Sequence, residues 1–146
     1  MRVLEAARQF RDSADPTELL GEIPFVGFAG IDAAVEGERL VSKMAFAPHL
    51  IGNPHLPALH GGTTAALLEI AAILELFWRG DTVRMPETIG LTVEYLRSAR
   101  PLDTFATCSI TKQGRRVAHV RVLAWQEAEE RLIAAAQGRF LLRPSP

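Results

Sequence analysis

The chain has 146 residues, 48% of them hydrophobic and 23% charged, a composition typical of one folded domain and unlike a disordered segment. Sixteen basic against seventeen acidic side chains give a net charge of −1, without the basic surplus that nucleic-acid binding needs. One cysteine excludes an internal disulfide framework. We expect a single domain over residues 1–146, located in the cytoplasm, because the N-terminus lacks the apolar core of a signal peptide.

The first half of the chain predicts short elements before a long one. Residues 1–20 form a helical segment in two parts, the second beginning at Asp15-Pro16, since proline is favoured in a first helical turn. Residues 25–47 are expected to be strand-like, with a hairpin turn at 35–39. Three prolines and a glycine predict a loop over residues 48–59.

The most unusual stretch spans residues 60–78. After residue 64, Glu69 and Glu75 are its only charged side chains. A helix that is apolar nearly all round lies inside a core, and we consider this one too short and too charged to cross a bilayer. The sequence predicts a long buried helix that ends at Gly80-Asp81.

Four strands are predicted after the helix, at residues 88–97, 105–111, 115–126 and 131–142. Short turns between them indicate an antiparallel meander in chain order, and residues 143–146 are expected to be a frayed tail. Alternation in the first strand places four apolar side chains on one face: Ile89, Leu91, Val93 and Tyr95.

This order of elements predicts an α+β fold. A long apolar helix needs a curved sheet wrapped around it to cover most of its surface. A single curved sheet leaves an edge and part of the helix exposed in a monomer, so a partner chain is expected.

A motif stands at the start of the long helix. His60-Gly61-Gly62 is followed by Glu69, nine positions after the histidine. Together with TIGLTVEYLRSARP at residues 88–101 and AAAQGRFLL at 134–142, it resembles the PaaI-type hotdog-fold acyl-CoA thioesterases over roughly residues 40–142. The resemblance implies a hotdog fold, in which a curved antiparallel sheet wraps a central helix. It also implies hydrolysis of acyl-CoA by a homodimer or dimer of dimers, without metal or prosthetic group.

The residues of this motif fit acyl transfer. A carboxylate in the middle of an apolar helix is costly to bury unless it has a partner or a task, and Glu69 could activate water or attack directly. Free N–H groups at a helix N-terminus stabilise a developing oxyanion, and glycine lets a substrate approach the backbone. A polar notch for Glu69 and a tight turn for the glycines are the structural alternatives. The resemblance assigns the oxyanion donor to Gly61, with Gly62 beside it.

The spacing of Gly61 and Glu69 indicates a shared site. Eight residues of helix separate them by about 12 Å, and the side chain of Glu69 recovers only part of that distance. One carbonyl cannot readily contact both groups in one chain. We therefore expect them to come from opposite subunits, as the resemblance also implies.

The resemblance implies three supporting residues. His60 is expected to shape the loop before Gly61 and to contact the thioester. Asn53 either orients the attacking water or forms an ordinary Asn-Pro turn, since Pro54 occupies the family's usual position. Thr88 either holds the attacking water or is an ordinary β-branched strand residue.

Basic side chains near strand ends are candidates for the phosphates of coenzyme A, because arginine binds phosphate in a bidentate manner; solvated turn charges are the alternative. These candidates are Arg97, Arg100, Arg115 and Arg116. The histidines and the cysteine show no metal-ligand spacing, so no metal site is expected.

Two other functions remain open. One is a hotdog enoyl-CoA hydratase or dehydratase, although this histidine-to-glutamate spacing is not the pattern of those enzymes. The other is an acyl-CoA-binding hotdog protein without catalysis. In each case the partner is an acyl-CoA rather than a nucleic acid or a membrane, and the acyl chain stays undetermined.

Overall fold

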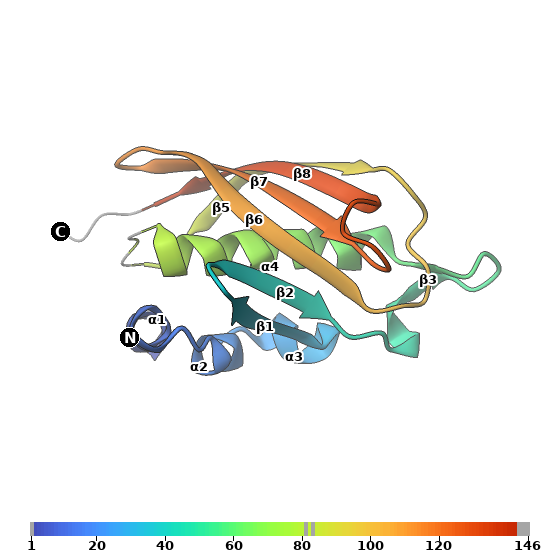
Figure 1. The fold of residues 1–146 in the computed structure, drawn as a ribbon, viewed down its shortest axis with the longest axis horizontal. Coiled ribbons are helices and arrows are strands. Elements are labelled where there is room, and N and C mark those ends of the chain that lie inside the picture. The colour runs from blue at the N-terminus through green and yellow to red at the C-terminus, as the bar shows by residue number, and fades with distance from the viewer. Residues whose placement is uncertain (1, 81, 83, 143–146) are drawn as a thin grey trace.

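The computed structural model describes residues 2–80, 82 and 84–142. Three short helices open the chain: α1 (Arg2–Ser13), α2 (Thr17–Gly21) and α3 (Pro24–Ala29) (Figure 1). The first two confirm the two-part helical segment. The second begins after Asp15, whose Oδ1 accepts a hydrogen bond from the N–H of Thr17 at 3.0 Å.

The helix α3 corrects the prediction that strand structure begins at residue 25. Pro24 suits the first turn of a helix, and Gly30 ends it in the left-handed conformation with φ of 71°. The hairpin follows as β1 (Ile31–Glu36) and β2 (Arg39–Met44), whose turn lies within the expected residues 35–39.

The proline-rich residues 48–59 are more ordered than the predicted loop. They contain a 3-10 helix (Pro48–Leu50) and two short strands, β3 (Ile51–Asn53) and β4 (Ala58–Leu59). These strands pair with each other in a sheet of their own. The small sheet leads directly into the central helix.

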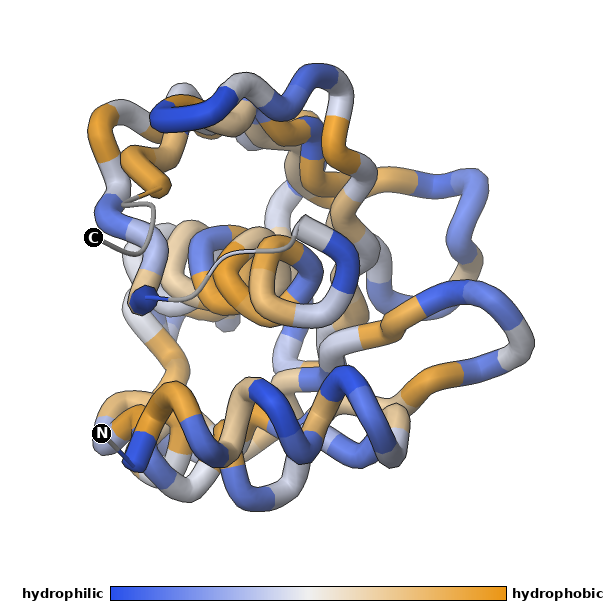
Figure 2. Tube along the Cα trace, turned by 90° about the vertical axis from the view of Figure 1, so that its left-hand side faces the viewer, coloured by the Kyte–Doolittle hydropathy of each residue, from blue (hydrophilic) through white to orange (hydrophobic). Residues whose placement is uncertain are grey.

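The central helix α4 (Gly61–Arg79) confirms the predicted long buried helix. It lies between the main sheet and the N-terminal helices, as the views from the side and the end show (Figures 1 and 2). On the lower side Phe10 of α1 stacks on Trp78 with ring centroids 6.0 Å apart. By length and composition α4 could cross a membrane, contrary to expectation, but more than half of it is buried inside the fold.

The main sheet has the order β1-β2-β6-β7-β8-β5, all antiparallel. Its later strands are β5 (Glu87–Tyr95), β6 (Thr104–Gln113), β7 (Val117–Trp125) and β8 (Leu132–Leu141). The predicted meander holds for β6, β7 and β8 but is wrong for β5, which pairs with β8 at the far edge. The connection over residues 96–103 is too long for a hairpin turn and instead links the edge strand to β6. The predicted tail and Asp81 lie outside the described residues.

Candidate active site

The first turn of α4 is held by the residue that precedes it. The N–H of His60 donates to the carbonyl of Leu50 at 2.8 Å, and its ring Nδ1 accepts from the N–H of Gly62 at 2.9 Å. A Cβ at Gly62 would lie 2.9 Å from that nitrogen, so glycine is required for this contact. His60 therefore acts as the N-terminal cap of α4.

The N–H of Gly61 is left at the open end of the helix. Within the described part of the chain it has no hydrogen-bond acceptor. The carbonyl on the other side of the same peptide group, that of His60, accepts from the Thr63 hydroxyl at 2.6 Å and from the Thr63 N–H at 2.9 Å. Hydrogen bonds to a peptide carbonyl polarise the group and strengthen its N–H as a donor, so Gly61 presents an activated donor.

Tyr95 packs over this donor from the end of β5. Its hydroxyl donates to the carbonyl of Gly61 at 2.8 Å, and a Cβ at Gly61 would lie 3.3 Å from the Tyr95 ring. Sequence reasoning counted Tyr95 only as an apolar strand residue and did not single out Thr63. The signal available for Tyr95 was its polar hydroxyl at the end of the strand face that alternation makes apolar.

Glu69 projects from the middle of α4 toward β5. The side chain is half-buried, and its Oε2 accepts a hydrogen bond from the Thr88 hydroxyl at 2.9 Å. Among the described residues Glu69 has no other hydrogen bond, so its second carboxylate oxygen is left for another partner. The structure thus joins two predicted site residues that lie 19 positions apart in the sequence.

An irregularity in β5 turns Thr88 toward Glu69. Thr88 pairs with Phe140 and Gly90 with Arg139, so one residue, Ile89, is inserted between adjacent partners. Directly opposed residues share one face of a sheet, and Phe140 is buried in the core. The bulge therefore places Thr88 on the side of α4 and leaves Ile89 51% exposed, which corrects its predicted place beside Leu91.

The second glutamate of α4 is the buried one. The Glu75 side chain is 8% exposed, and its Oε1 lies 3.0 Å from Nε of Arg79. Burial raises the pKa of Glu75 from its ordinary value of 4.5, while the charge of Arg79 acts in the opposite direction. Sequence reasoning gave Glu75 no role, because the motif spacing singled out Glu69 and the apolar pattern of the helix does not show which glutamate is buried.

Replacing Glu75 by glutamine is expected to change how stability depends on pH. Because its pKa is raised by folding, the folded state holds the proton more tightly, and wild-type stability falls as pH rises through the carboxyl range. The variant should lose less stability than wild type between about pH 4 and about pH 7. Thermal unfolding of Glu75→Gln, wild type and the exposed control Glu94→Gln checks this. Parallel pH profiles for Glu75→Gln and wild type would contradict it.

The other supporting candidate, Asn53, lies in β3. Its side-chain Oδ1 accepts from the N–H of His55 at 3.0 Å, within the turn between β3 and β4. This is the contact of an ordinary Asx turn. A catalytic role for Asn53 stays a prediction, and the structure gives it no contact with Glu69.

The four candidate arginines lie at two ends of the molecule. Arg97 follows β5 near Gly61, with its side chain on the carbonyl of Leu132 at 2.6 Å, and Arg100 lies 3.4 Å from Glu127. Arg115 and Arg116 lie in the turn after Gln113, whose side chain donates to the carbonyl of Gly80 at the other end of α4. A helix of 19 residues, about 28 Å long, separates the two ends. One chain therefore cannot use all four on one phosphate.

In the described part of the chain, no three His, Cys, Asp or Glu side chains lie close enough together to bind a metal ion. The site as built consists of a carboxylate, a hydroxyl and backbone N–H groups.

A long buried helix in the hollow of a curved antiparallel sheet is the hotdog fold, and this chain has it. The model of the thioesterase superfamily matches residues 56–133. The chain belongs to this superfamily.

The relatives agree with this assignment. The Escherichia coli K12 medium/long-chain acyl-CoA thioesterase YigI is 32% identical over 120 residues, covering 72% of this chain and 77% of that protein. A Chromobacterium violaceum crystal structure is 32% identical with a TM-score of 0.78, covering 97% of this chain and 99% of that one. A Bacillus halodurans protein solved with CoA shares the fold, at 19% identity and a TM-score of 0.76 over 99% and 93% of the two chains. The family match and the similarity to YigI together identify the chain as a thioester hydrolase.

Proposed function

We propose that this protein hydrolyses acyl-CoA thioesters, with Glu69 as the reacting carboxylate and the N–H of Gly61 as the oxyanion donor. The observation that carries the proposal is that α4 presents both groups. Its Glu69 carboxylate accepts a hydrogen bond from Thr88 of β5, and its capped first turn presents the free N–H of Gly61. The name of YigI supports acyl-CoA as the substrate class and medium to long acyl chains as the first to test.

The proposed reaction needs one water molecule. The carboxylate oxygen of Glu69 that Thr88 leaves free takes a proton from water, and the water oxygen attacks the thioester carbonyl carbon. The carbonyl oxygen gains negative charge against the N–H of Gly61. The C–S bond then breaks, and the thiolate recovers the proton, giving the free acid and coenzyme A.

Direct attack by Glu69 is the second route. It would form an acyl anhydride with release of coenzyme A, and water would then hydrolyse the anhydride. Single turnover in ¹⁸O-labelled water tests for this route: label on Glu69 shows that water attacked an anhydride at the protein carbonyl, whereas direct attack of water on the thioester leaves label only in the free acid. Both routes need the same carboxylate and donor, and coenzyme A enters only as part of the substrate.

Each site is proposed to lie between two subunits. Glu69 and Gly61 are eight residues apart on one straight helix, about 12 Å along its axis. A second copy of the chain, in a homodimer or dimer of dimers, would bring its own Gly61 to Glu69 of the first. The exposed edge strand β5, which carries both Thr88 and Tyr95, supports this arrangement because an unpaired edge favours association.

The remaining residues have lesser roles in the proposal. His60 caps the helix and fixes the position of Gly61, and the hydrogen bond from Thr88 orients the carboxylate. Among the candidate phosphate ligands, Arg97 has the position that fits best, since it lines a cavity of about 350 Å³ together with Gly61 and Tyr95. The thioesterase superfamily and the relative YigI favour hydrolysis of a thioester over hydration of an enoyl-CoA.

A panel of acyl-CoAs tests the proposal. We expect the purified protein to release free thiol from medium- and long-chain acyl-CoA, and to leave the double bond of an enoyl-CoA unhydrated. Thiol release is followed with a thiol reagent and hydration by loss of the enoyl absorbance. Hydration without thiol release would favour the hydratase, and tight acyl-CoA binding without either reaction would favour the binding protein.

A further inference from the structure

The outer face of the main sheet carries a groove that the proposed reaction does not use. It has a volume of about 390 Å³ and is formed by β5, β6, β7 and β8. Ligand pockets generally begin at roughly 300 Å³, so the groove is large enough for a small molecule. The strand register shows that the groove lies on the face of the sheet that points away from α4. Gly90, which lines the groove, pairs with Arg139 on that outer face. The next residue, Leu91, pairs with Gly138 and faces the core.

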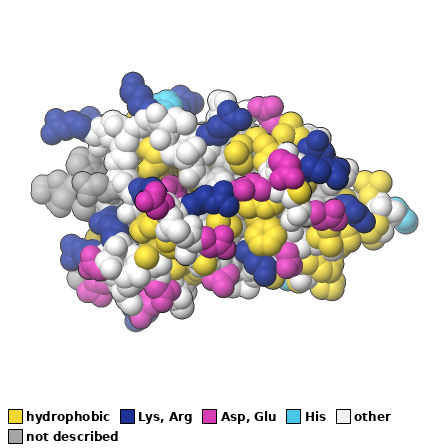
Figure 3. Space-filling view, viewed as in Figure 1, with side chains coloured by type: hydrophobic (Ala, Val, Ile, Leu, Met, Phe, Trp, Pro, Cys, Tyr) yellow, Lys and Arg dark blue, Asp and Glu magenta, His cyan; other side chains and the backbone are white. Residues whose placement is uncertain are grey.

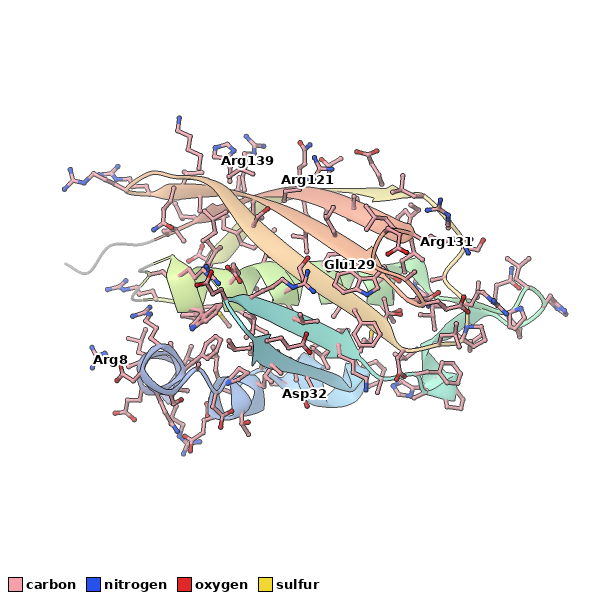
Figure 4. The ribbon with its side chains drawn as sticks, in the orientation of Figure 1. Arg8, Asp32, Arg121, Glu129, Arg131 and Arg139 are labelled. Carbon is pink, nitrogen blue, oxygen red and sulfur yellow. The ribbon has the colours of Figure 1, made fainter. Side chains whose placement is uncertain are left out.

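Two arginines and a histidine line this groove from two neighbouring strands. His119 and Arg121 come from β7, and Arg139 comes from β8, directly opposite His119 in the register. Figure 4 shows Arg121 and Arg139 close together on the outer side of the sheet, and Figure 3 shows Lys, Arg and His side chains projecting from the upper edge of the molecule, where this face is seen in profile. Lys112 of β6 is opposite His119 on its other side, and Arg115 and Arg116 follow in the adjoining turn.

These charges are not neutralised by neighbouring carboxylates. Among the described residues no Asp or Glu lies within ion-pair distance of Arg121 or Arg139. Some surface cations elsewhere do have such a partner, as with Arg39 and Glu129, Lys43 and Asp103, or Arg100 and Glu127. Two arginines that have no carboxylate partner among the described residues therefore line the same groove.

We propose that this groove binds the phosphate groups of a nucleotide. Two arginine forks beside each other suit a ligand with more than one phosphate, because each guanidinium can bind phosphate oxygens in a bidentate manner. Thr92 and Gln137 add neutral hydrogen-bonding groups to the lining. Gly90 leaves open space there, since a Cβ at this position would meet only Arg139 Nη2, at 3.5 Å.

A second copy of the chain fits this face poorly. A two-fold axis through this groove would bring Arg121 and Arg139 of one copy against the same patch of the other. Like charges placed opposite each other cost free energy. A polyanion is complementary to the same surface.

The nucleotide could be the end of the substrate itself or a separate molecule. Thr88 faces Glu69 on one side of β5, and Gly90, two residues further, faces the groove on the other. The groove is therefore separated from the catalytic carboxylate by the edge strand alone. The proposal rests on the groove and its charges and not on the proposed reaction.

Binding of adenosine 3′,5′-bisphosphate, measured by titration calorimetry, tests the proposal without any turnover. The double variant Arg121→Gln/Arg139→Gln should bind at least about tenfold more weakly than wild type, since a hydrogen bond to a charged group contributes about that factor or more. The control Arg8→Gln/Arg131→Gln removes the same charge from two exposed sites away from the groove (Figure 4). Control binding should equal that of wild type. Added salt should weaken wild-type binding, because the groove is exposed.

Kinetics with two substrates identifies the source of the nucleotide. If the groove holds the nucleotide end of acyl-CoA, the double variant raises KM for acyl-CoA but not for the matching acyl-N-acetylcysteamine thioester, which carries no phosphate. If the nucleotide is a separate ligand, bisphosphate binding falls while both KM values stay unchanged. Either result supports the proposal. Absence of bisphosphate binding by wild type, or equal binding by the double variant and its control, would overturn it.

Discussion

Replacing Glu69 by glutamine is expected to lower kcat for thioester hydrolysis by about 10²–10⁴-fold, the usual contribution of a positioned acid or base. Glutamine has nearly the same shape and can still accept the hydrogen bond that Thr88 donates to the carboxylate at 2.9 Å. It cannot take a proton from water or attack a carbonyl. The loss should therefore appear in kcat with little change in the thermal midpoint, measured by thiol release and by thermal unfolding.

Two comparison variants show whether the loss is specific. Glu94→Gln removes a carboxylate from the exposed side of β5 and should keep full activity. Thr88→Val leaves the Glu69 carboxylate but removes its hydrogen bond, so it should retain more activity than Glu69→Gln. If Glu69→Gln turned over acyl-CoA at the wild-type rate, the assignment of the reacting carboxylate would be wrong.

The periodicity of apolar residues predicted the fold correctly wherever neighbouring residues in the sequence determine the structure. The apolar run after Gly61 predicted α4, and alternation predicted each of the later strands. It failed where partners are chosen by long-range packing: β5 pairs with β8 rather than β6, because strand order depends on how the sheet covers α4. It also failed at Pro24–Ala29, where a proline and a left-handed glycine enclose a helix of six residues.

The candidate site shows the same division. The motif placed His60, Gly61 and Glu69 at one helix, and in the structure Gly61 and Glu69 lie on α4 with His60 as its N-terminal cap. Strict alternation would have turned Thr88 away from Glu69, and only the bulge at Ile89 brings their side chains together. Bulges leave little trace in a single sequence, so this contact was out of reach of a period-two argument.

The sequence also failed to show which glutamate of α4 is buried, for a related reason. Both glutamates of α4 interrupt the same apolar helix, and the sequence argument assigned the cost of burial to Glu69. In the structure Glu69 is half-exposed toward β5, whereas Glu75 is buried beside Arg79. The difference depends on where the sheet ends over each position of the helix, which helical periodicity does not contain.

Mixing two inactive variants is expected to restore activity if each site is shared between subunits. Gly61→Val should be inactive by itself, because a Cβ at this position already lies 3.3 Å from the Tyr95 ring and the larger side chain covers the N–H. In a mixed dimer with Glu69→Gln, one site carries both substitutions and the other carries neither. Random assembly makes half the dimers mixed, so a co-refolded mixture should recover about a quarter of wild-type activity.

The control is a mixture of Glu69→Gln with Glu69→Ala, in which no intact site can form and no activity should return. Exchange between subunits is checked by tagging the two variants differently and isolating the doubly tagged species. Without restoration in that species, Gly61 and Glu69 would have to serve one carbonyl from a single chain. Because a straight helix keeps them about 12 Å apart, that result would remove Gly61 as the donor and leave Glu69 to act with an N–H from another part of the chain.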